Sequence, residues 1–322
     1  MDVRRAPGLL ISVGAAAALA LPAPAHAAFP GANGAIAFGW AERHEDELGQ
    51  RPPTAKRSID IARPGGQGRR SLRACMEVDG RPDMGDCSIE YLTPAWAPGG
   101  KRVAFDAGTR LAVMRSDGTG FRLLPQITSD DGEPAWSPDG TRLVLSGTET
   151  VGGESDLHVL ELATGRARRL TSDGGRSPAW SSRNRIAFSR GGSPSRPGTG
   201  TVYTVRPGGG GYRLLARRAA NPSWSPRGTR LVLVRPFRTL TRLWVVGADG
   251  TGLRRMVTPG ADNPQQPCWS PDGRQIAYTG FEGNLVAQRL RDRRIRQVAP
   301  GGVNAESSFA ASSPDWQPLP RR

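Results

Sequence analysis

Short runs of alternating apolar and polar residues, separated by tight turns rich in Gly, Pro, Asp and Ser, fill most of the chain. The run Leu143 to Leu145 is typical, because it follows a Ser-Pro-Asp-Gly turn and precedes another strand-like pair. In such turns Pro presets φ, Asp bonds to its own backbone and Gly takes a positive φ. No segment beyond residue 27 has a sustained helical period, so the pattern predicts an all-β fold.

One segment, consisting of a Trp, a Ser-Pro-Asp-Gly turn and an alternating strand, recurs along the chain. Its tryptophans are Trp96, Trp136, Trp180, Trp224, Trp269 and Trp316, at spacings of 40, 44, 44, 45 and 47 residues. Each repeat has room for four short strands, which is the pattern of a propeller blade. The third copy lacks Pro-Asp-Gly, and we expect Arg183 and Asn184 to close a turn that is one residue shorter.

The two ends of the array complement each other. The segment Asn33 to Phe38 matches the strand that follows the turn, yet no Trp strand precedes it, and Trp316 has no strand after it. We therefore expect the N- and C-terminal strands to pair in one shared blade, which closes the ring and hides its edges. The sequence predicts a six-bladed β-propeller of four-stranded blades over residues 28–322.

The Trp-Ser-Pro-Asp-Gly repeat, together with the Asp-Gly-Thr-Gly hairpin at residues 117–120, resembles the TolB-like (WD40-like) β-propeller repeat family of bacterial envelope proteins. The resemblance covers essentially all of the chain after residue 27. It implies the propeller fold and, for function, the binding of a protein or cell-envelope component. TolB itself carries an additional N-terminal α/β domain, which we do not expect here.

The first 27 residues have the pattern of a signal peptide. Arg4 and Arg5 precede an apolar run from Leu9 to Ala23, and Ala25-His26-Ala27 supplies the small residues of a cleavage site. The alternative is a membrane anchor, but the run is shorter than the about 20 apolar residues that a spanning helix needs. We therefore expect cleavage after Ala27, with no membrane span afterwards, and a periplasmic, cell-envelope or secreted location.

The expected export would place the cysteines in an oxidising compartment, where disulfides form and persist. Cys75 and Cys87 lie in one polar segment of little apolar content, and we expect them to form a disulfide that orders it. Cys268 stands beside Trp269 in a repeated apolar segment and is expected to be a small buried residue. The cysteine and histidine spacings do not fit a zinc site.

The formal net charge of +15 raises the question of nucleic-acid binding. Almost all of the basic residues are arginines, with Lys56 and Lys101 as the exceptions, and they form no Arg-rich block or stripe interleaved with aromatic residues. We therefore expect no nucleic-acid partner. The basic residues concentrate on the outer strands, where charge also protects exposed edges from pairing.

A propeller has two faces. In the family's arrangement the Ser-Pro-Asp-Gly turns and the outer hairpins share one side, named here the turn face. The connections between second and third strands and between blades share the other side, named the loop face. The loop-face connections carry more carboxylates than basic residues and include the two longest insertions, residues 39–57 and 73–90. Long loops on a rigid scaffold are frequent recognition sites.

The residue before each motif proline is polar in every copy, and blade geometry places these residues near the loop-face mouth of the axial channel. They are Thr93, Glu133, Ser177, Asn221, Gln266 and Ser313. With Glu90 and Glu306 nearby, we interpret them as a candidate polar ring for a peptide end, a sugar or a cation such as Ca2+. The alternative is that a channel mouth is polar simply because it is wet.

Catalytic groups are scarce. No Gly-x-Ser-x-Gly elbow is present, and after signal removal only His44 and His158 remain as histidines, without a partner at metal-ligand spacing. The leading hypothesis is therefore a monomeric, non-enzymatic binding module without a cofactor. One alternative is a small-molecule lyase or lactonase that uses Glu133 and a channel-bound cation. Another is a structural role in which the acidic face of one copy pairs with the basic side of another.

Overall fold

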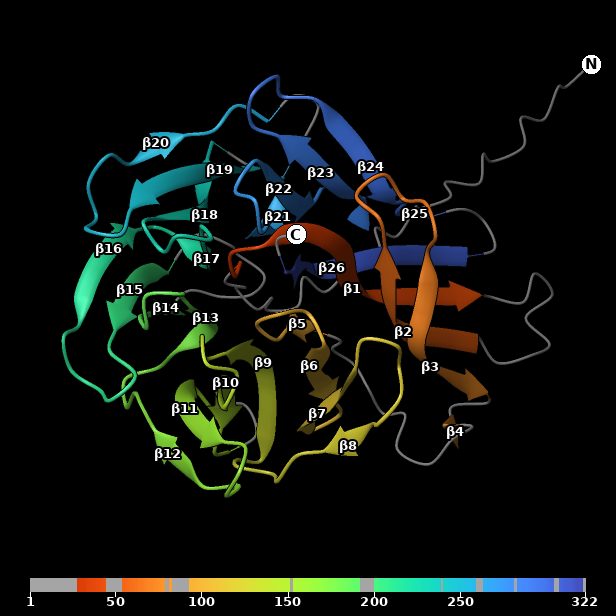
Figure 1. The fold of residues 1–322 in the computed structure, drawn as a ribbon, viewed down its shortest axis with the longest axis horizontal. Helices are drawn as coiled ribbons and strands as arrows, with labels where there is room; N and C mark the ends of the chain where they lie inside the picture. Colours follow the sequence, from red (N-terminus) through yellow and green to blue (C-terminus); the bar gives the residue numbers. More distant parts are fainter. Residues whose placement is uncertain are drawn as a thin grey trace, which may run out of the picture.

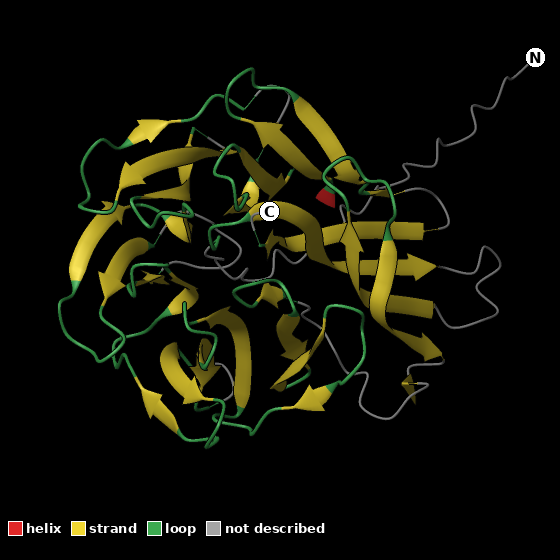
Figure 2. Cartoon of the chain, viewed as in Figure 1, coloured by secondary structure: helices red, strands yellow, loops and turns green. Residues whose placement is uncertain are grey.

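The computed structural model describes residues 28–44, 54–78, 81–82, 93–150, 153–191, 200–238, 240–258, 263–280, 283–303 and 307–320. These residues form six antiparallel sheets arranged as a ring around a central axis (Figures 1 and 2). The expected six-bladed all-β propeller is confirmed. None of the described segments contains a helix long and apolar enough to cross a membrane.

The blades are numbered I to VI in chain order. Blade I consists of β26 (Ser307–Leu319), β1 (Ala32–His44), β2 (Thr54–Ala62) and β3 (Arg70–Val78), flanked by the short strands β25 (Gly302–Val303) and β4 (Arg81–Pro82). Blade II consists of β5 (Ala95–Trp96), β6 (Arg102–Ala107), β7 (Arg110–Arg115) and β8 (Arg122–Leu123). Blade III consists of β9 (Asp130–Trp136), β10 (Arg142–Thr148), β11 (Ser155–Glu161) and β12 (Ala167–Arg169).

The other three blades follow the same order. Blade IV consists of β13 (Arg176–Trp180), β14 (Ile186–Arg190), β15 (Thr201–Val205) and β16 (Arg213–Arg217). Blade V consists of β17 (Ala220–Trp224), β18 (Arg230–Phe237), β19 (Leu240–Gly247) and β20 (Arg254–Arg255). Blade VI consists of β21 (Gln265–Trp269), β22 (Gln275–Thr279), β23 (Leu285–Arg289) and β24 (Ile295–Ala299). The innermost strands of neighbouring blades contact one another all the way around the ring.

The ring closes where the chain ends meet. Strand β1 pairs antiparallel with β26, and Ile36 lies opposite Trp316 in the register. The expected shared blade is therefore confirmed, and it is the red-and-blue sheet at the right of Figure 1. Because β1 pairs with β2 on its other side, the terminal strands leave no open edge between them.

The repeated Ser-Pro-Asp-Gly turn has the expected hydrogen bonds and backbone angles. In blade III the Ser137 hydroxyl and the Thr141 amide both donate to Oδ1 of Asp139, at 2.5 and 3.0 Å, and Gly140 takes a φ of 68°. In blade IV, Asn184 replaces the glycine with a φ of 57° and donates its amide to the Ser181 carbonyl. The shortened turn expected there is confirmed.

The repeated tryptophans fasten blade to blade. All six are at most 5% exposed. The indole Nε1 of Trp136 donates to the Ala95 carbonyl of blade II at 2.9 Å, and Trp224 Nε1 donates in the same way to Ala179 of blade IV. Each apolar cluster therefore spans two neighbouring blades, so the core is a ring of interfaces and not a single centre.

The insertions expected at residues 39–57 and 73–90 need correction, because both are partly strand. Strand β1 continues to His44, β2 begins at Thr54 and β3 reaches Val78, so blade I has longer strands than the repeat suggests. Cys75 lies in β3 opposite Arg57, whereas the expected disulfide also needs Cys87, which lies outside the described residues. The expected signal segment, residues 1–27, also lies outside them.

Cys268 and His158 are both buried inside the fold. Cys268 is a free thiol with no exposed surface, as expected, and burial raises its pKa well above the ordinary value. His158 lies in strand β11 and is only 4% exposed.

Candidate functional site

The polar residues before the motif prolines lie in or just before the innermost strands, three residues before each motif tryptophan. Thr93, Glu133, Ser177 and Ser313 are buried, and Asn221 and Gln266 are partly exposed. Five of the six have a positive φ: Glu133 (54°), Ser177 (51°), Asn221 (52°), Gln266 (52°) and Ser313 (49°). Register shifts mark a bulge at the same place in the first strands of blades III to VI and in blade I. A bulge turns the backbone amide away from its own sheet.

Those amides are bound by side chains from the preceding blade. The Glu133 amide donates to Asp106 Oδ1 of blade II at 3.0 Å, and the Ser177 amide donates to Glu133 Oε2 at 2.6 Å. At two further interfaces Asn221 donates to Ser189 Oγ, and Ser313 donates to Gln266 Oε1. The ring residues thus form a belt of hydrogen bonds between neighbouring blades. Much of their hydrogen-bonding capacity is therefore used inside the fold.

Two carboxyl groups of this belt, those of Asp106 and Glu133, are buried, although carboxyl groups ordinarily lie in water. Burial raises the pKa of Asp106 well above its usual value, and the nearby charge of Glu133 adds to the rise. Burial also raises the pKa of Glu133, although the Ser177 amide opposes the change. Thr93 lies beside this pair, at the start of blade II. Glu90 and Glu306, the other two expected site residues, lie outside the described residues.

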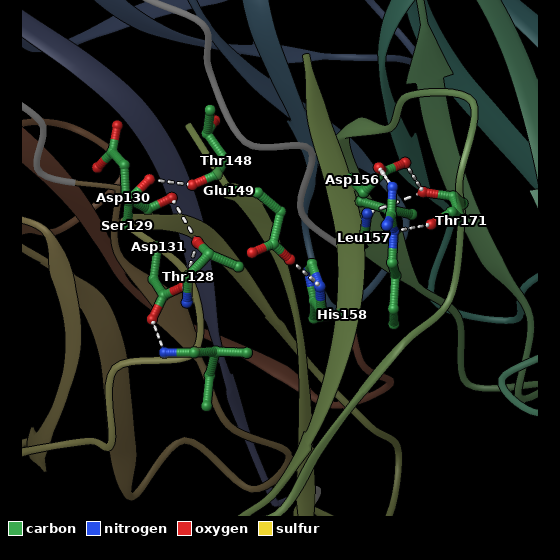
Figure 3. A network of polar contacts seen from close by, with 12 residues as sticks. Thr128, Ser129, Asp130, Asp131, Thr148, Glu149, Asp156, Leu157, His158 and Thr171 are labelled. Carbon is green, nitrogen blue, oxygen red and sulfur yellow. Dashed lines mark hydrogen bonds and ion pairs between the residues drawn. The ribbon is translucent and has the colours of Figure 1, made fainter. Parts of the chain in front are cut away.

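A second polar network occupies the loop-face end of blade III (Figure 3). Asp131 is 1% exposed and accepts hydrogen bonds from the Ile127 amide (2.6 Å) and from the amide and hydroxyl of Thr128 (2.8 and 2.7 Å). His158 Nε2 lies 3.6 Å from Glu149 Oε1, and its Nδ1 is buried without a hydrogen-bond partner. This network holds the connection before β9 against the hairpin of β10 and β11.

The outer half of the same blade end is held by Asp156. Its Oδ1 accepts hydrogen bonds from the Thr171 hydroxyl at 2.8 Å and the Gly174 amide at 3.0 Å, and its Oδ2 pairs with Arg169. The Thr171 hydroxyl also accepts a hydrogen bond from the Leu157 amide. The loop from β12 to β13 is therefore fixed to β11 by one buried carboxylate, as Figure 3 shows.

On this fixed base, exposed carboxylates gather at neighbouring strand ends. Thr148 lies opposite Asp130 on one side and Ser155 on the other, so Asp130, Glu149 and Glu154 lie at the ends of three adjacent strands. Asp173 follows on the next connection, where it pairs with Arg190 at 3.3 Å. We name Asp130, Glu149, Glu154 and Asp173 the acidic edge. It displays negative charge on rigid strand ends, at the face where recognition was expected.

The described residues contain no cluster of three or more His, Cys, Asp or Glu side chains that could hold a metal ion. Glu133 is the residue that the cation-dependent alternative would use. Its Oε2 accepts a hydrogen bond from the Ser177 amide, and its Oε1 lies 3.4 Å from the Ser177 hydroxyl. The acidic edge, by contrast, keeps exposed oxygens.

A family model described as the TolB beta propeller domain matches residues 74–319, which is most of the chain. The chain belongs to the TolB beta propeller domain family. The expected resemblance is thereby confirmed at the level of the family.

Two curated proteins are similar to parts of this chain in sequence. The Tol-Pal system protein TolB of Gluconobacter oxydans is 35% identical over 107 residues, which are 30% of this chain and 23% of that protein. An uncharacterized protein of Agrobacterium fabrum is 25% identical over 201 residues, or 58% of this chain and 61% of that protein. The matches thus span less than two thirds of the length of these curated relatives.

Solved structures support the architecture alone, because their sequence identities are low. The crystal structure of TolB from Acinetobacter baumannii superimposes with a TM-score of 0.65 at 19% identity, covering 88% of this chain and 67% of that one. A putative TolB from Agrobacterium tumefaciens gives a TM-score of 0.61 at 13% identity, with 88% and 99% coverage.

Sequence reasoning located the polar ring but not its role, because hydrogen bonding between blades depends on the bulges. It also missed Asp106, Asp131 and Asp156, which lie on different strands of their blades. The acidic edge was also missed, although the excess of carboxylates in loop-face connections is a signal that could have indicated it.

Proposed function

We propose that this protein is an exported, non-enzymatic recognition module of the cell envelope that binds a partner protein or envelope component at its loop face. The acidic edge on blade III is the observation that carries the proposal. Asp130, Glu149 and Glu154 end three hydrogen-bonded strands, so their carboxylates are presented in a fixed arrangement. Membership of the TolB beta propeller domain family supports a binding role.

The chemistry of the acidic edge defines the partner. Asp130 and Glu154 are exposed, and neither is joined by an ion pair within the described residues, so their charges are available to a ligand. A segment rich in Lys or Arg would gain complementary charge there, and such complementarity mainly speeds association and selects the partner. The buried anchors Asp131 and Asp156 keep the strand ends in place, so little ordering is needed on binding.

The location proposed is the periplasm or the cell exterior. It rests on the signal-peptide pattern of residues 1–27 and on the family, because related repeats occur in bacterial envelope proteins. In such a compartment the partner is a protein segment or a component of the envelope and not a nucleic acid.

Charge reversal tests the proposal. Wild-type protein is used to capture its partner from native envelope extract, and the purified partner is then titrated against D130K/E149K/E154K by biolayer interferometry. We expect at least a tenfold loss of affinity, because several close charge pairs turn from attractive to repulsive. Binding by the wild type should also weaken between about 0.05 M and about 0.5 M salt, since ions screen exposed charges.

The matched control is Glu161→Lys, which changes an exposed carboxylate at the opposite end of β11, on the turn face. It should bind the partner as the wild type does. Equal affinity of the wild type and the triple variant would refute the assignment of binding to the acidic edge.

A further inference from the structure

The turn face repeats a contact between an arginine of one blade and the motif tryptophan of the next. The Arg102 guanidinium lies 4.7 Å from the Trp136 ring centroid, and Arg142 lies 5.2 Å from that of Trp180. Arg230 occupies the equivalent position in blade V, as the first residue of the second strand. The motif tryptophan of the next blade, which Arg230 would contact by analogy, is Trp269. Here a cavity lies where the stacked pair would be expected.

This cavity has a volume of about 690 Å³ and lies between blades V and VI. Its lining includes Arg227, Arg230, Trp269 and the two turn prolines Pro226 and Pro271. An adjoining hollow of about 680 Å³ also includes Arg227 and extends the space to Arg274. Because the two hollows share residues, we treat them as one and name it the turn-face groove. Each of the two hollows is in the size range of small-ligand sites.

The start of the described chain forms the remaining wall. Gly31 lines both hollows, and its amide donates to the Pro271 carbonyl at 3.3 Å. Ala28 and Phe29 are buried before it, and the Ala28 amide donates to the Trp224 carbonyl of blade V. The beginning of the red segment lies near the centre of the ring in Figure 1. The groove is therefore bounded on three sides by ordered backbone.

The groove is strongly cationic. Arg227, Arg230 and Arg274 are exposed, and no ion pair or side-chain hydrogen bond ties down their guanidinium groups within the described residues. The one carboxylate in the lining, Asp272, is held inside its own turn, where Oδ1 accepts the Ser270 hydroxyl (2.6 Å) and the Arg274 amide (2.9 Å). Two free guanidinium groups on the blade V side and one on the blade VI side favour an oxyanion, which each can bind through two parallel hydrogen bonds.

The lining also offers an apolar wall, formed by Trp269 and two prolines. Trp269 is 5% exposed, and its Nε1 is buried without a hydrogen-bond partner. The same is true of Trp96 and Trp316, whereas the Nε1 atoms of Trp136 and Trp224 each donate to a carbonyl of the preceding blade. Pro226 and Pro271 supply apolar surface for the body of a ligand.

We propose that the turn-face groove is a binding site for an acidic sugar, in which a carboxylate or phosphate meets the three arginines and the ring lies against the prolines and Trp269. The groove is on the opposite face from the acidic edge, so this site is independent of the function proposed above. A uronic acid and a sugar phosphate share the chemistry that it recognises.

Isothermal titration calorimetry at about 0.05 M salt tests the site with glucuronate, glucose 6-phosphate, inorganic phosphate and glucose. We expect saturable binding of at least one charged sugar and none of glucose, and the charged sugar that binds identifies the oxyanion. The R227A/R274A variant should bind at least tenfold more weakly, because each lost charge-assisted hydrogen bond is worth about a factor of ten or more. Both side chains are exposed, so an unchanged melting temperature checks the fold.

Arg166→Ala is the matched control, because Arg166 is an exposed arginine beside the blade III hairpin of the same face. It should leave the affinity unchanged. The proposal is overturned if neither charged sugar binds the wild type, or if R227A/R274A binds as tightly as R166A. Inorganic phosphate that binds as tightly as the sugar would overturn the assigned role of the prolines and Trp269.

Discussion

Glu133 provides the most direct test of the belt between blades. Its Oε2 accepts the buried Ser177 amide at 2.6 Å, across the interface of blades III and IV. Both residues are at most 6% exposed, so water does not readily replace the carboxylate in Glu133→Ala. A buried donor left without a partner costs about 1–3 kcal/mol. For a domain of this size, this corresponds to a fall in melting temperature of about 2–6 °C.

The conservative variant Glu133→Gln separates hydrogen bonding from charge. Glutamine keeps a carbonyl acceptor for the Ser177 amide but carries no charge. Burial raises the pKa of Glu133 in the folded protein above its unfolded value, so the folded state binds the proton more tightly. The stabilisation from this carboxyl group is therefore fully present below the unfolded pKa and is lost as pH rises through the folded pKa. Glu133→Gln should accordingly lose less stability than the wild type between pH 5 and pH 8.

Thermal unfolding followed by tryptophan fluorescence at both pH values measures the two effects, with the exposed Glu161→Gln as control. The expected order of stability at pH 8 is Glu133→Gln at or above wild type, and Glu133→Ala below it. The reasoning is refuted if Glu133→Ala melts with the wild type, or if Glu133→Gln is the less stable of the two variants.

Three further predictions concern ring closure at Trp316, the thiol of Cys268 and the turn that contains Asp139. Trp316→Ala should cost about 3–5 kcal/mol in urea unfolding, because the ring of Trp316 is 1% exposed beside the terminal strand pair; a cost below about 1 kcal/mol would contradict the closure described. In a C75S/C87S background, Cys268 should resist a thiol reagent until the protein unfolds, since burial raises the pKa of its thiol, and rapid labelling of the native protein would disprove this. Burial favours a higher pKa for Asp139, but hydrogen bonds from Ser137 and Thr141 outweigh it and lower the pKa to about 2; NMR titration should show this value, and Ser137→Ala should raise it.

The fold could be predicted because the repeat carries its own geometry. The tryptophan spacing sets the number of blades, and the complementary chain ends reveal the shared sheet, as the pairing of Ile36 with Trp316 confirms. The shortened turn at Asn184 could also be predicted, since Asn tolerates a positive φ. These features depend on residues that are close in sequence or repeated at a fixed period.

The site could be predicted only in part. The polar residues before the prolines are visible in the sequence, but the bulges that turn their amides toward the preceding blade are not. Asp106 and Glu133 come together from different blades, so neither the contact nor the raised pKa could be inferred from spacing. The turn-face groove depends on how Arg230 lies relative to Trp269, although other blades with the same sequence pattern form a stack.

The position of β26 has a consequence for the order of assembly. Of the described strands, β26 is synthesised last, yet it lies innermost in blade I and pairs with β1, which is synthesised first. During synthesis, β1 must wait with one side unpaired until more than 260 residues have followed it. A bare strand of that length invites pairing with other chains, so the nascent protein should depend on a chaperone more than the finished disc does. The strand that closes the ring, β26, is therefore also the last of the described strands to become available for pairing.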